Sequence, residues 1–444
     1  MTGTVKRLVI CGAAGRDFHD FNVVYRGDPA VRVVAFTAAQ IPGIAERRYP
    51  PELAGSLYPD GIPIVEEAGL AALCEAETID EVVFAYSDVT NDHVMRIGST
   101  ALAAGADFTL LGPRSTMLET SRPAIAVCAV RTGCGKSQTS RYIASELTRQ
   151  GYRVATLRHP MPYGEPAKQA VQRFATLADI DAANCSLEER EEYEPHVEAG
   201  GTVFAGVDYA RILEQAQAEA DVVLWDGGNN DFSFIRAGLN LAIVDALRPA
   251  RLDGHYPGSV VLETADLVVV NKVDAATPEQ LRIVNDELDR LVPGTPRVMA
   301  ASPVTLDDPA ALAGARVLIV EDGPTITHGD MPYGAGYQAV RAVADAEIVD
   351  PRPFATPEIA AVFEKYPHIG PVLPAMGYGS AQVAALVRTI NAADVDVVVA
   401  GTPIDLARVG DLRMPVVRAH YRYVDAGEPG LMHFVDEFLS RSAV

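Results

Sequence analysis

The sequence predicts an α/β protein with two doubly wound parallel-sheet domains and a C-terminal α/β extension. Short segments rich in Val, Ile and Leu alternate with helical segments along most of the chain, which is the rhythm of parallel sheets covered by helices. At 444 residues the chain exceeds one ordinary hydrophobic core, so two or three domains are expected. The content of 48% hydrophobic and 22% charged residues is typical of globular α/β proteins.

The first domain, expected over residues 1–120, is a Rossmann-like parallel sheet. Gly12 and Gly15 follow its first strand, but a complete dinucleotide fingerprint needs the pattern GxGxxG. The shorter GxxG turn fits an anion or a regulatory ligand as well as it fits NAD. The strand segments of this domain lie at 7–15, 31–39, 81–88 and 107–113.

The second domain, expected over residues 121–345, begins where the segment Ser121-Arg122-Pro123 restarts the strand pattern. After it, proline-punctuated loops predominate, and residues 346–444 are expected to form a C-terminal α/β extension that completes the substrate site. The sequence leaves open whether this extension is a third domain or the far edge of the second sheet. The strand segments of the second domain lie at 124–130, 153–158, 221–228, 241–247, 267–274, 297–302 and 315–322.

The net charge of the chain limits the classes of molecule that it is expected to bind. A formal net charge of -22 argues against nucleic-acid binding, because such binding gains affinity by neutralising phosphates with basic residues. A phosphorylated substrate would need a locally positive pocket in this negative field. No apolar run reaches the ~20 residues of a membrane span, so we expect a cytoplasmic protein without membrane association. The five cysteines include no CxxC pair, which predicts free thiols.

A phosphate-binding loop (P-loop) is the strongest functional signal. The apolar strand at 124–130 runs into a Gly-bearing loop and then a long helix, so backbone N–H groups and the helix N-terminus can wrap a polyphosphate. Lys136 is expected to bridge the β- and γ-phosphates, and Ser137 to ligate Mg²⁺. Val130 stands in place of the usual first glycine, and the spacing resembles the loop of the dimeric ATPases and GTPases (the SIMIBI class) that include dethiobiotin synthetase. The expected nucleotide-binding residues of the loop are Thr132, Gly133, Cys134, Gly135, Lys136, Ser137 and Gln138.

Two further strand ends complete the expected nucleotide site. Asp226 ends an apolar strand, where its carboxylate would lie near the metal; the alternative is a helix or turn cap. An NKxD motif follows a later strand, the arrangement by which many GTPases read guanine through a carboxylate, here that of Asp274. The alternative for this carboxylate is to cap the helix that starts near Thr277. The motif residues are Asn271, Lys272 and Asp274.

Cationic residues after two other strands are expected to hold the substrate. Arg158 and His159 offer a guanidinium and an imidazole, which suit phosphate oxygens, and His328 follows a later strand in the same way. Both loops contain the tetrapeptide Met-Pro-Tyr-Gly, at 161–164 and 331–334. The alternative for each histidine is a solvated loop side chain.

A second candidate for anion binding lies near the C-terminus, where three cationic residues alternate along one expected strand and therefore share a face. The alternative is an edge strand whose charges discourage aggregation. These residues are Arg418, His420 and Arg422.

Together these segments resemble the cyclic 2,3-diphosphoglycerate synthetase family. The resemblance implies ATP-dependent closure of an intramolecular phosphoanhydride in 2,3-diphosphoglycerate, with release of ADP and phosphate, by a cytoplasmic homodimer. Lys136 and Mg²⁺, held by Ser137 and Asp226, would stabilise the transferring phosphoryl group. Arg158, His159 and His328 would hold the two phosphates of the small anionic substrate. The matching segments are GAAGRDFHDFN, RTGCGKSQTSR, RHPMPYG, WDGGNNDF, VVVNKVD, EDGPTITHGDMPYGAG and PRPF…YPHIGPVLPAMGYG.

A GTPase of the SIMIBI class, acting as a metallochaperone or regulatory switch, is the rival hypothesis. It would share the P-loop, Asp226 and the NKxD motif. Such proteins usually carry a Cys/His metal cluster, which this sequence does not suggest, and they have little use for large N- and C-terminal regions. A sensor without catalysis fits least, because the expected Mg²⁺ site is complete.

Overall fold

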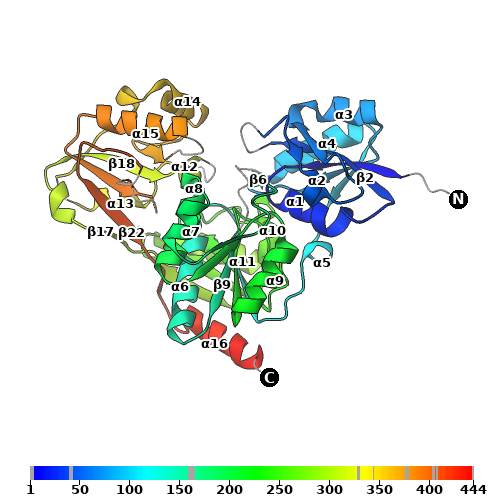
Figure 1. The fold of residues 1–444 in the computed structure, drawn as a ribbon. Helices are drawn as coiled ribbons and strands as arrows, with labels where there is room; N and C mark the ends of the chain where they lie inside the picture. Colours follow the sequence, from blue (N-terminus) through cyan, green and yellow to red (C-terminus); the bar gives the residue numbers. More distant parts are fainter. Residues whose placement is uncertain are drawn as a thin grey trace.

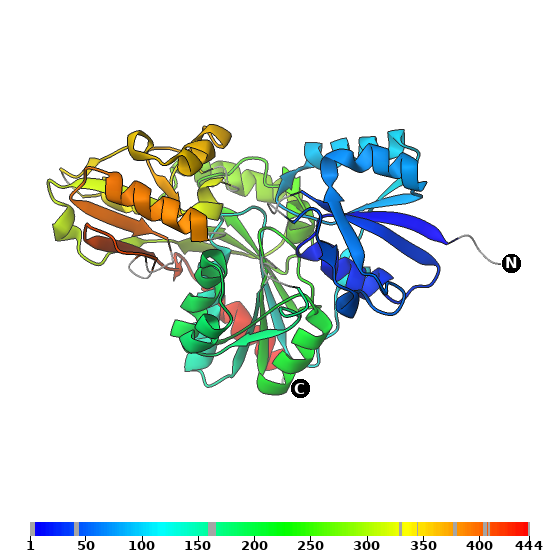
Figure 2. The ribbon, with the colours of Figure 1, turned by 45° about the horizontal axis from the view of Figure 1, so that its top comes forward.

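The computed structural model describes residues 5–39, 44–158, 166–327, 331–343, 345–375, 380–402, 406 and 409–442. Three sheet-based units make up this part of the chain (Figure 1), and the views in Figures 1 and 2 agree that the first and third flank the second. We call them the N-terminal unit (5–116), the central unit (117–302 and 423–442) and the C-terminal unit (303–421). Parallel strands covered by helices predominate, as the sequence predicts.

The N-terminal unit is a six-stranded sheet in the order β3-β4-β2-β1-β5-β7. All neighbouring strands run parallel except β3, which pairs antiparallel with β4. The expected parallel sheet is therefore present. Its strands are β1 (Lys6–Cys11), β2 (Val31–Ala38), β3 (Arg48–Tyr49), β4 (Ile62–Glu66), β5 (Glu81–Phe84) and β7 (Asp107–Leu110). Its helices are α1 (Arg16–Asp20), α2 (Pro51–Ala54), α3 (Leu70–Glu77), α4 (Asn91–Ala103) and α5 (Pro113–Thr116).

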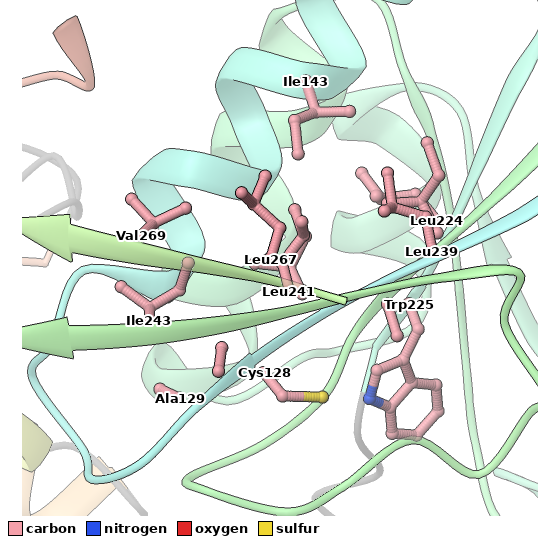
Figure 3. Packing of buried hydrophobic residues seen from close by; sticks show 14 of the residues in the cluster. Cys128, Ala129, Ile143, Leu224, Trp225, Leu239, Leu241, Ile243, Leu267 and Val269 are labelled. Carbon is pink, nitrogen blue, oxygen red and sulfur yellow. The ribbon is translucent and has the colours of Figure 1, made fainter. Parts of the chain in front are cut away.

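The central unit is a nine-stranded sheet in the order β10-β11-β9-β12-β8-β13-β15-β16-β23. Its inner strands are parallel and buried along their whole length, which is why they read as unbroken apolar runs. In Figure 3, Ile143 of α6 packs among Leu224 of β12, Leu241 of β13 and Val269 of β15. The strands are β8 (Ala124–Ala129), β9 (Val154–Arg158), β10 (Gln172–Phe174), β11 (Thr202–Ala205), β12 (Val222–Asp226), β13 (Leu239–Asp245), β15 (Leu267–Asn271), β16 (Arg297–Ala301) and β23 (Val424–Asp425). The helices are α6 (Lys136–Arg149), α7 (Leu177–Ala182), α8 (Leu187–Glu198), α9 (Tyr209–Glu219), α10 (Gly258–Glu263) and α11 (Pro278–Leu291).

The C-terminal unit has its own sheet, in the order β17-β22-β21-β18-β19, with β20 also paired to β18. The expectation that residues 315–322 continue the second sheet is therefore wrong, because they form β18, which pairs with β19, β20 and β21. We propose that the third unit begins near residue 303 instead of 346. The strands are β17 (Val304–Leu306), β18 (Arg316–Asp322), β19 (Glu347–Ile348), β20 (Leu373–Ala375), β21 (Val397–Gly401) and β22 (Val416–Tyr421). The helices are α12 (Gly323–Thr327), α13 (Ala335–Arg341), α14 (Pro357–Lys365) and α15 (Ser380–Ala392).

The end of the chain returns to the central unit. β23 extends the central sheet beside β16, and α16 (Leu431–Ser442) lies against that sheet, red in Figure 1. Leu431, Val435 and Leu439 of α16 are buried in the central core, at the helical spacing of one apolar face. None of the helices that the structure describes is long and apolar enough to cross a bilayer.

The residues that follow the GxxG turn of the N-terminal unit pack against the central unit. Arg16 is 2% exposed, its Nε lies 3.1 Å from Oδ1 of Asp231, and its guanidinium lies 3.7 Å from the ring centre of Phe232. The imidazole of His19 stacks on Phe234 with ring centres 4.2 Å apart. A second link is the antiparallel pairing of β6 (Val89–Thr90) with β14 (His255–Tyr256). The polar residues after Gly15 thus form a buried interface.

Candidate functional site

The P-loop lies between β8 and α6 as the sequence predicts. The loop needs glycine at Gly135, which caps α6 with φ of 101°, in the region that L residues avoid. A Cβ atom there would lie 2.0 Å from Nδ2 of Asn271, so no other residue fits without displacing that amide. The loop and the first turn of α6 line a cleft. Their backbone N–H groups are thereby presented to an anion at the helix N-terminus.

The first two residues of the NKxD motif donate hydrogen bonds to carbonyl oxygens of the P-loop. Nδ2 of Asn271 donates to the carbonyl oxygen of Cys134 at 2.9 Å, and Nζ of Lys272 donates to that of Gly133 at 2.6 Å. Asp274 is exposed and does not line the cleft; its Oδ1 accepts from the backbone N–H of Ser302 at 2.9 Å. The side chain of Thr277 caps α11, so the alternative of helix capping by Asp274 is wrong.

A buried network behind the loop adds Arg248, which sequence reasoning missed. Its Nη2 donates to the carbonyl oxygen of Thr132 at 2.8 Å, and its Nε lies 3.1 Å from Oδ2 of Asp245, which Nζ of Lys272 also contacts at 2.8 Å. Burial alone would raise the pKa of Asp245, but the charges of Lys272 and Arg248 hold it below its usual value. The hydroxyl of Thr132 donates to Oδ2 of Asp88 at 2.7 Å, so the N-terminal unit also touches the loop.

Asp226 lies at the end of β12, next to the P-loop strand, and is fully buried. Its Oδ1 lies 2.8 Å from Nζ of Lys136, and its Oδ2 contacts Arg158 and lies 3.1 Å from Nε2 of His196. Burial would raise the pKa of Asp226, but Arg158, Lys136 and the hydrogen bond with His196 hold it well below its usual range. Both carboxylate oxygens of Asp226 thus contact cationic or hydrogen-bonding side chains. No cluster of three or more metal-binding side chains occurs among the described residues.

Of the expected substrate clamps, the structure describes Arg158. Arg158 is 1% exposed and does not line the cleft; its guanidinium pairs with Asp226 and Glu192, so it positions the carboxylate of Asp226. His159, the first Met-Pro-Tyr-Gly copy and His328 lie outside the described residues. The second tetrapeptide copy is described, and its Met331 lines the cleft.

The cleft lies between the central and C-terminal units and has an empty volume of about 1270 Å³, part of it open to solvent. Its lining carries side chains of both charges. The cationic side chains are those of Arg131, Lys136, Arg141 and Lys272, and they lie among the polar side chains of Ser137, Gln138 and Asn229. The lining carboxylates, which we call the acidic wall, are those of Glu191 and Glu192 from α8 and of Glu321 and Asp322 from the end of β18.

Glu321 of the acidic wall is fully buried. Its carboxylate accepts hydrogen bonds from the backbone N–H of Tyr337 at 2.7 Å and of Gly336 at 3.3 Å. A Cβ atom on Gly401 would lie 2.3 Å from Oε2, so the backbone approaches this carboxylate closely. Burial raises the pKa of Glu321 to about 7. The sequence analysis did not identify Glu321 because it placed this strand in the other sheet.

The three C-terminal cationic residues, Arg418, His420 and Arg422, do not line the cleft. β22 lies between β17 and β21, so it is not an edge strand either. His420 is exposed and pairs with Asp307, with 2.7 Å between Nε2 and Oδ1. Of the described residues of β22, the cleft is lined by Tyr421, whose side chain points away from the His420 face as strand alternation requires.

Comparison with known proteins gives one relative over nearly the full length. Arginine synthetase ArcE of Thermococcus kodakarensis is 52% identical to the chain over 433 residues, which cover 98% of the chain and 97% of the relative. No protein-family model matches the sequence.

Two solved structures show distant likenesses. LpxK from Aquifex aeolicus, in complex with ATP, has a TM-score of 0.42 and 12% identity, with 73% of this chain and 90% of LpxK covered. Cobyrinic acid a,c-diamide synthase from Mycobacterium smegmatis, with a bound ATP analogue and magnesium, has a TM-score of 0.18 and 17% identity, with 40% and 71% covered. These likenesses are too distant to bear on function.

Proposed function

The chain belongs to the same family as the arginine synthetase ArcE of Thermococcus kodakarensis, and we propose that it is an ATP-dependent ligase that builds the guanidinium group of arginine. The observation that carries this proposal is a cleft whose lining holds both cations and carboxylates. A triphosphate needs the cations of the P-loop and α6, and ammonium or a guanidinium product needs the carboxylates. Both are placed within one cavity.

The chemistry follows from the product. Replacing one terminal nitrogen of arginine by oxygen gives citrulline, whose ureido carbon is too poor an electrophile for direct attack by ammonia. Attack of the ureido oxygen on the γ-phosphorus of ATP would release ADP and give an O-phosphorylated isourea. Ammonia would then add to the ureido carbon, and inorganic phosphate would leave with the C–O bond electrons. Citrulline, ammonia and ATP thus give arginine, ADP and phosphate.

The residues of the chain would act mainly by positioning and electrostatics. The P-loop amides and Lys136 would stabilise charge on the transferring phosphoryl group, for which Lys136 must exchange Asp226 for phosphate oxygens. Arg158 and His196 would hold Asp226 in place during that exchange. Mg²⁺, when bound with ATP, would supply further positive charge at the phosphates, and Ser137 is the side-chain hydroxyl of the loop that could reach it. The acidic wall would stabilise the developing guanidinium.

Closure of the phosphoanhydride in 2,3-diphosphoglycerate is the second candidate, since the sequence resemblance implies it and the P-loop would serve it equally. The acidic wall argues against it. Carboxylates of Glu191, Glu192, Glu321 and Asp322 would repel a substrate with two phosphates, and like charges at close range in a partly buried site are costly. A GTPase switch would use the same loop. The homodimer and the cytoplasmic location stay predictions.

A product assay separates these functions. The purified protein is incubated with Mg²⁺ and either ATP or GTP, together with citrulline and ammonium or with 2,3-diphosphoglycerate, and followed by phosphorus NMR and amino-acid chromatography. Arginine, ADP and phosphate in equal amounts support the ligase, and Lys136→Ala is expected to abolish all three. A cyclic phosphate product would establish the second candidate. Hydrolysis of GTP without either product would point to the switch.

A further inference from the structure

Arg141 is a cationic residue that lines the cleft. It lies on α6 and is half-buried in the cleft wall. No carboxylate of the described residues forms an ion pair with it; its guanidinium lies 6.0 Å from the ring centre of Tyr421. A partly desolvated guanidinium is favoured where a ligand carboxylate or phosphate completes its hydrogen bonds.

Two carboxylates line the same cleft as this tyrosine. The charges of Glu191 and Asp322 both act on Tyr421 and raise its pKa, which burial raises as well. They come from different units, α8 and β18, and each is fixed by a hydroxyl: that of Thr402 donates to Glu191, and that of Thr325 donates to Asp322. One guanidinium and two carboxylates therefore converge on one phenol in the cavity.

We infer that Arg141 and Tyr421 bind the α-carboxylate of the amino-acid substrate, and that Glu191 and Asp322 bind its α-ammonium group. The inference rests on the proposed function and names the subsite for the head of its substrate. An α-amino acid carries one charge of each sign on a single carbon, and this is the pattern that the four side chains complement. A phosphate at Arg141 would satisfy the guanidinium but would be repelled by the two carboxylates.

The spacing along α6 fits this orientation. Arg141 follows Lys136 by five residues, a rise of about 7.5 Å along the helix axis with a rotation of about 140° around it, and both residues line the cleft. The ureido carbon of citrulline is five bonds from Cα, about 6 Å in an extended chain. A head group held at Arg141 can therefore place the ureido oxygen near the phosphoryl group that Lys136 contacts.

The test is the substitution Arg141→Gln, with Arg149→Gln as matched control. Arg149 lies on the same helix, is exposed and pairs only with Glu146 among the ion pairs of the described residues. Calorimetry measures the Kd of arginine and of ATP, and kinetics measures KM for citrulline. We expect Arg141→Gln to raise the Kd of arginine and the KM for citrulline by about 10- to 100-fold, because a charge-assisted hydrogen-bonded pair is lost. The Kd of ATP is expected to change by less than about threefold. The control is expected to change neither ligand.

Ligand analogues make the assignment specific. Argininamide, which lacks the α-carboxylate charge, is expected to bind the unsubstituted protein more weakly than arginine, whereas Arg141→Gln should bind the two alike. Should Arg141→Gln not fold, Tyr421→Phe tests the same subsite, with an expected loss of about three- to tenfold for arginine.

Measurements of binding and of turnover test the amino-acid subsite and the ligase function separately. Arginine binding that depends on Arg141, without turnover, would keep the subsite and overturn the proposed ligase. The subsite would be overturned if Arg141→Gln still turned over citrulline, bound arginine with unchanged affinity and bound ATP more weakly. Arg141 would then be assigned to the triphosphate. No arginine or citrulline binding by the unsubstituted protein would overturn both.

Discussion

Replacing Gly135 by alanine is expected to damage nucleotide binding specifically. The φ of 101° at this residue costs an L residue about 1–2 kcal/mol. The new Cβ would also lie 2.0 Å from Nδ2 of Asn271 and 2.7 Å from Nε2 of Gln138. Moving the Asn271 amide breaks its hydrogen bond to Cys134, a further loss of about 1 kcal/mol. The sum is about 2–3 kcal/mol.

This cost is expected to appear in the Kd of ATP. Without nucleotide, the Gly135→Ala loop can relax away from the strained conformation, and ATP must restore it on binding. A cost of about 2–3 kcal/mol corresponds to about 30- to 150-fold weaker binding by calorimetry. Gly151→Ala is the control, because Gly151 has φ of 95° but open space around its Cβ position, at the turn after α6. It should lower stability and leave the Kd unchanged. An unaltered Kd in Gly135→Ala would refute this account of the loop.

Three further predictions concern other parts of the molecule. Arg16→Met leaves buried Asp231 without its charge partner and is expected to lower the free energy of unfolding by about 3–5 kcal/mol, measured by urea denaturation; Asp231→Asn in the same chain should recover part of the loss. Burial raises the pKa of Glu321 from 4.5 to about 7, so the folded protein holds more protons than the unfolded chain in this window and loses stability as pH rises through it. Glu321→Gln cannot ionise at this position and therefore does not lose this stability. The free energy of unfolding of the variant, relative to that of the unsubstituted protein, should rise by about 3 kcal/mol from pH 4.5 to 7. Parallel pH profiles of the two proteins would contradict the burial of this carboxylate. Asp274→Ala is expected to change the Kd of ATP less than about threefold, because the carboxylate is exposed, does not line the cleft and accepts from the backbone N–H of Ser302. A large loss would indicate that Asp274 reads the base.

The P-loop could be predicted from sequence because its signals are local. An apolar strand, two glycines and a helix start within a few residues define one geometry, and the structure has Gly135 and Lys136 where that geometry requires them. Asp226 could be predicted for the same reason, since it ends a strand that pairs directly with the P-loop strand.

The partners of distant segments could not be predicted. The apolar run at 315–322 predicts a buried parallel strand, but the same run would suit either sheet. It belongs to the C-terminal sheet because it pairs with β21, and this tertiary pairing cannot be read from the run itself. Glu321 was missed with it. His196 and Glu191 lie on α8, whose charged sequence predicts a solvated face, whereas the structure buries both residues at contacts with other segments. Arg158 follows a strand as expected, but packing turns it toward Asp226.

The most direct test of the central claim follows the ureido oxygen. Citrulline labelled with ¹⁸O in its ureido group is incubated with the protein, ATP, Mg²⁺ and ammonium, and the inorganic phosphate is analysed by mass spectrometry. Activation of the ureido oxygen by ATP predicts one ¹⁸O atom in each phosphate, formed in step with arginine and absent in Lys136→Ala. Phosphate without ¹⁸O, in a reaction that still forms arginine, would contradict it.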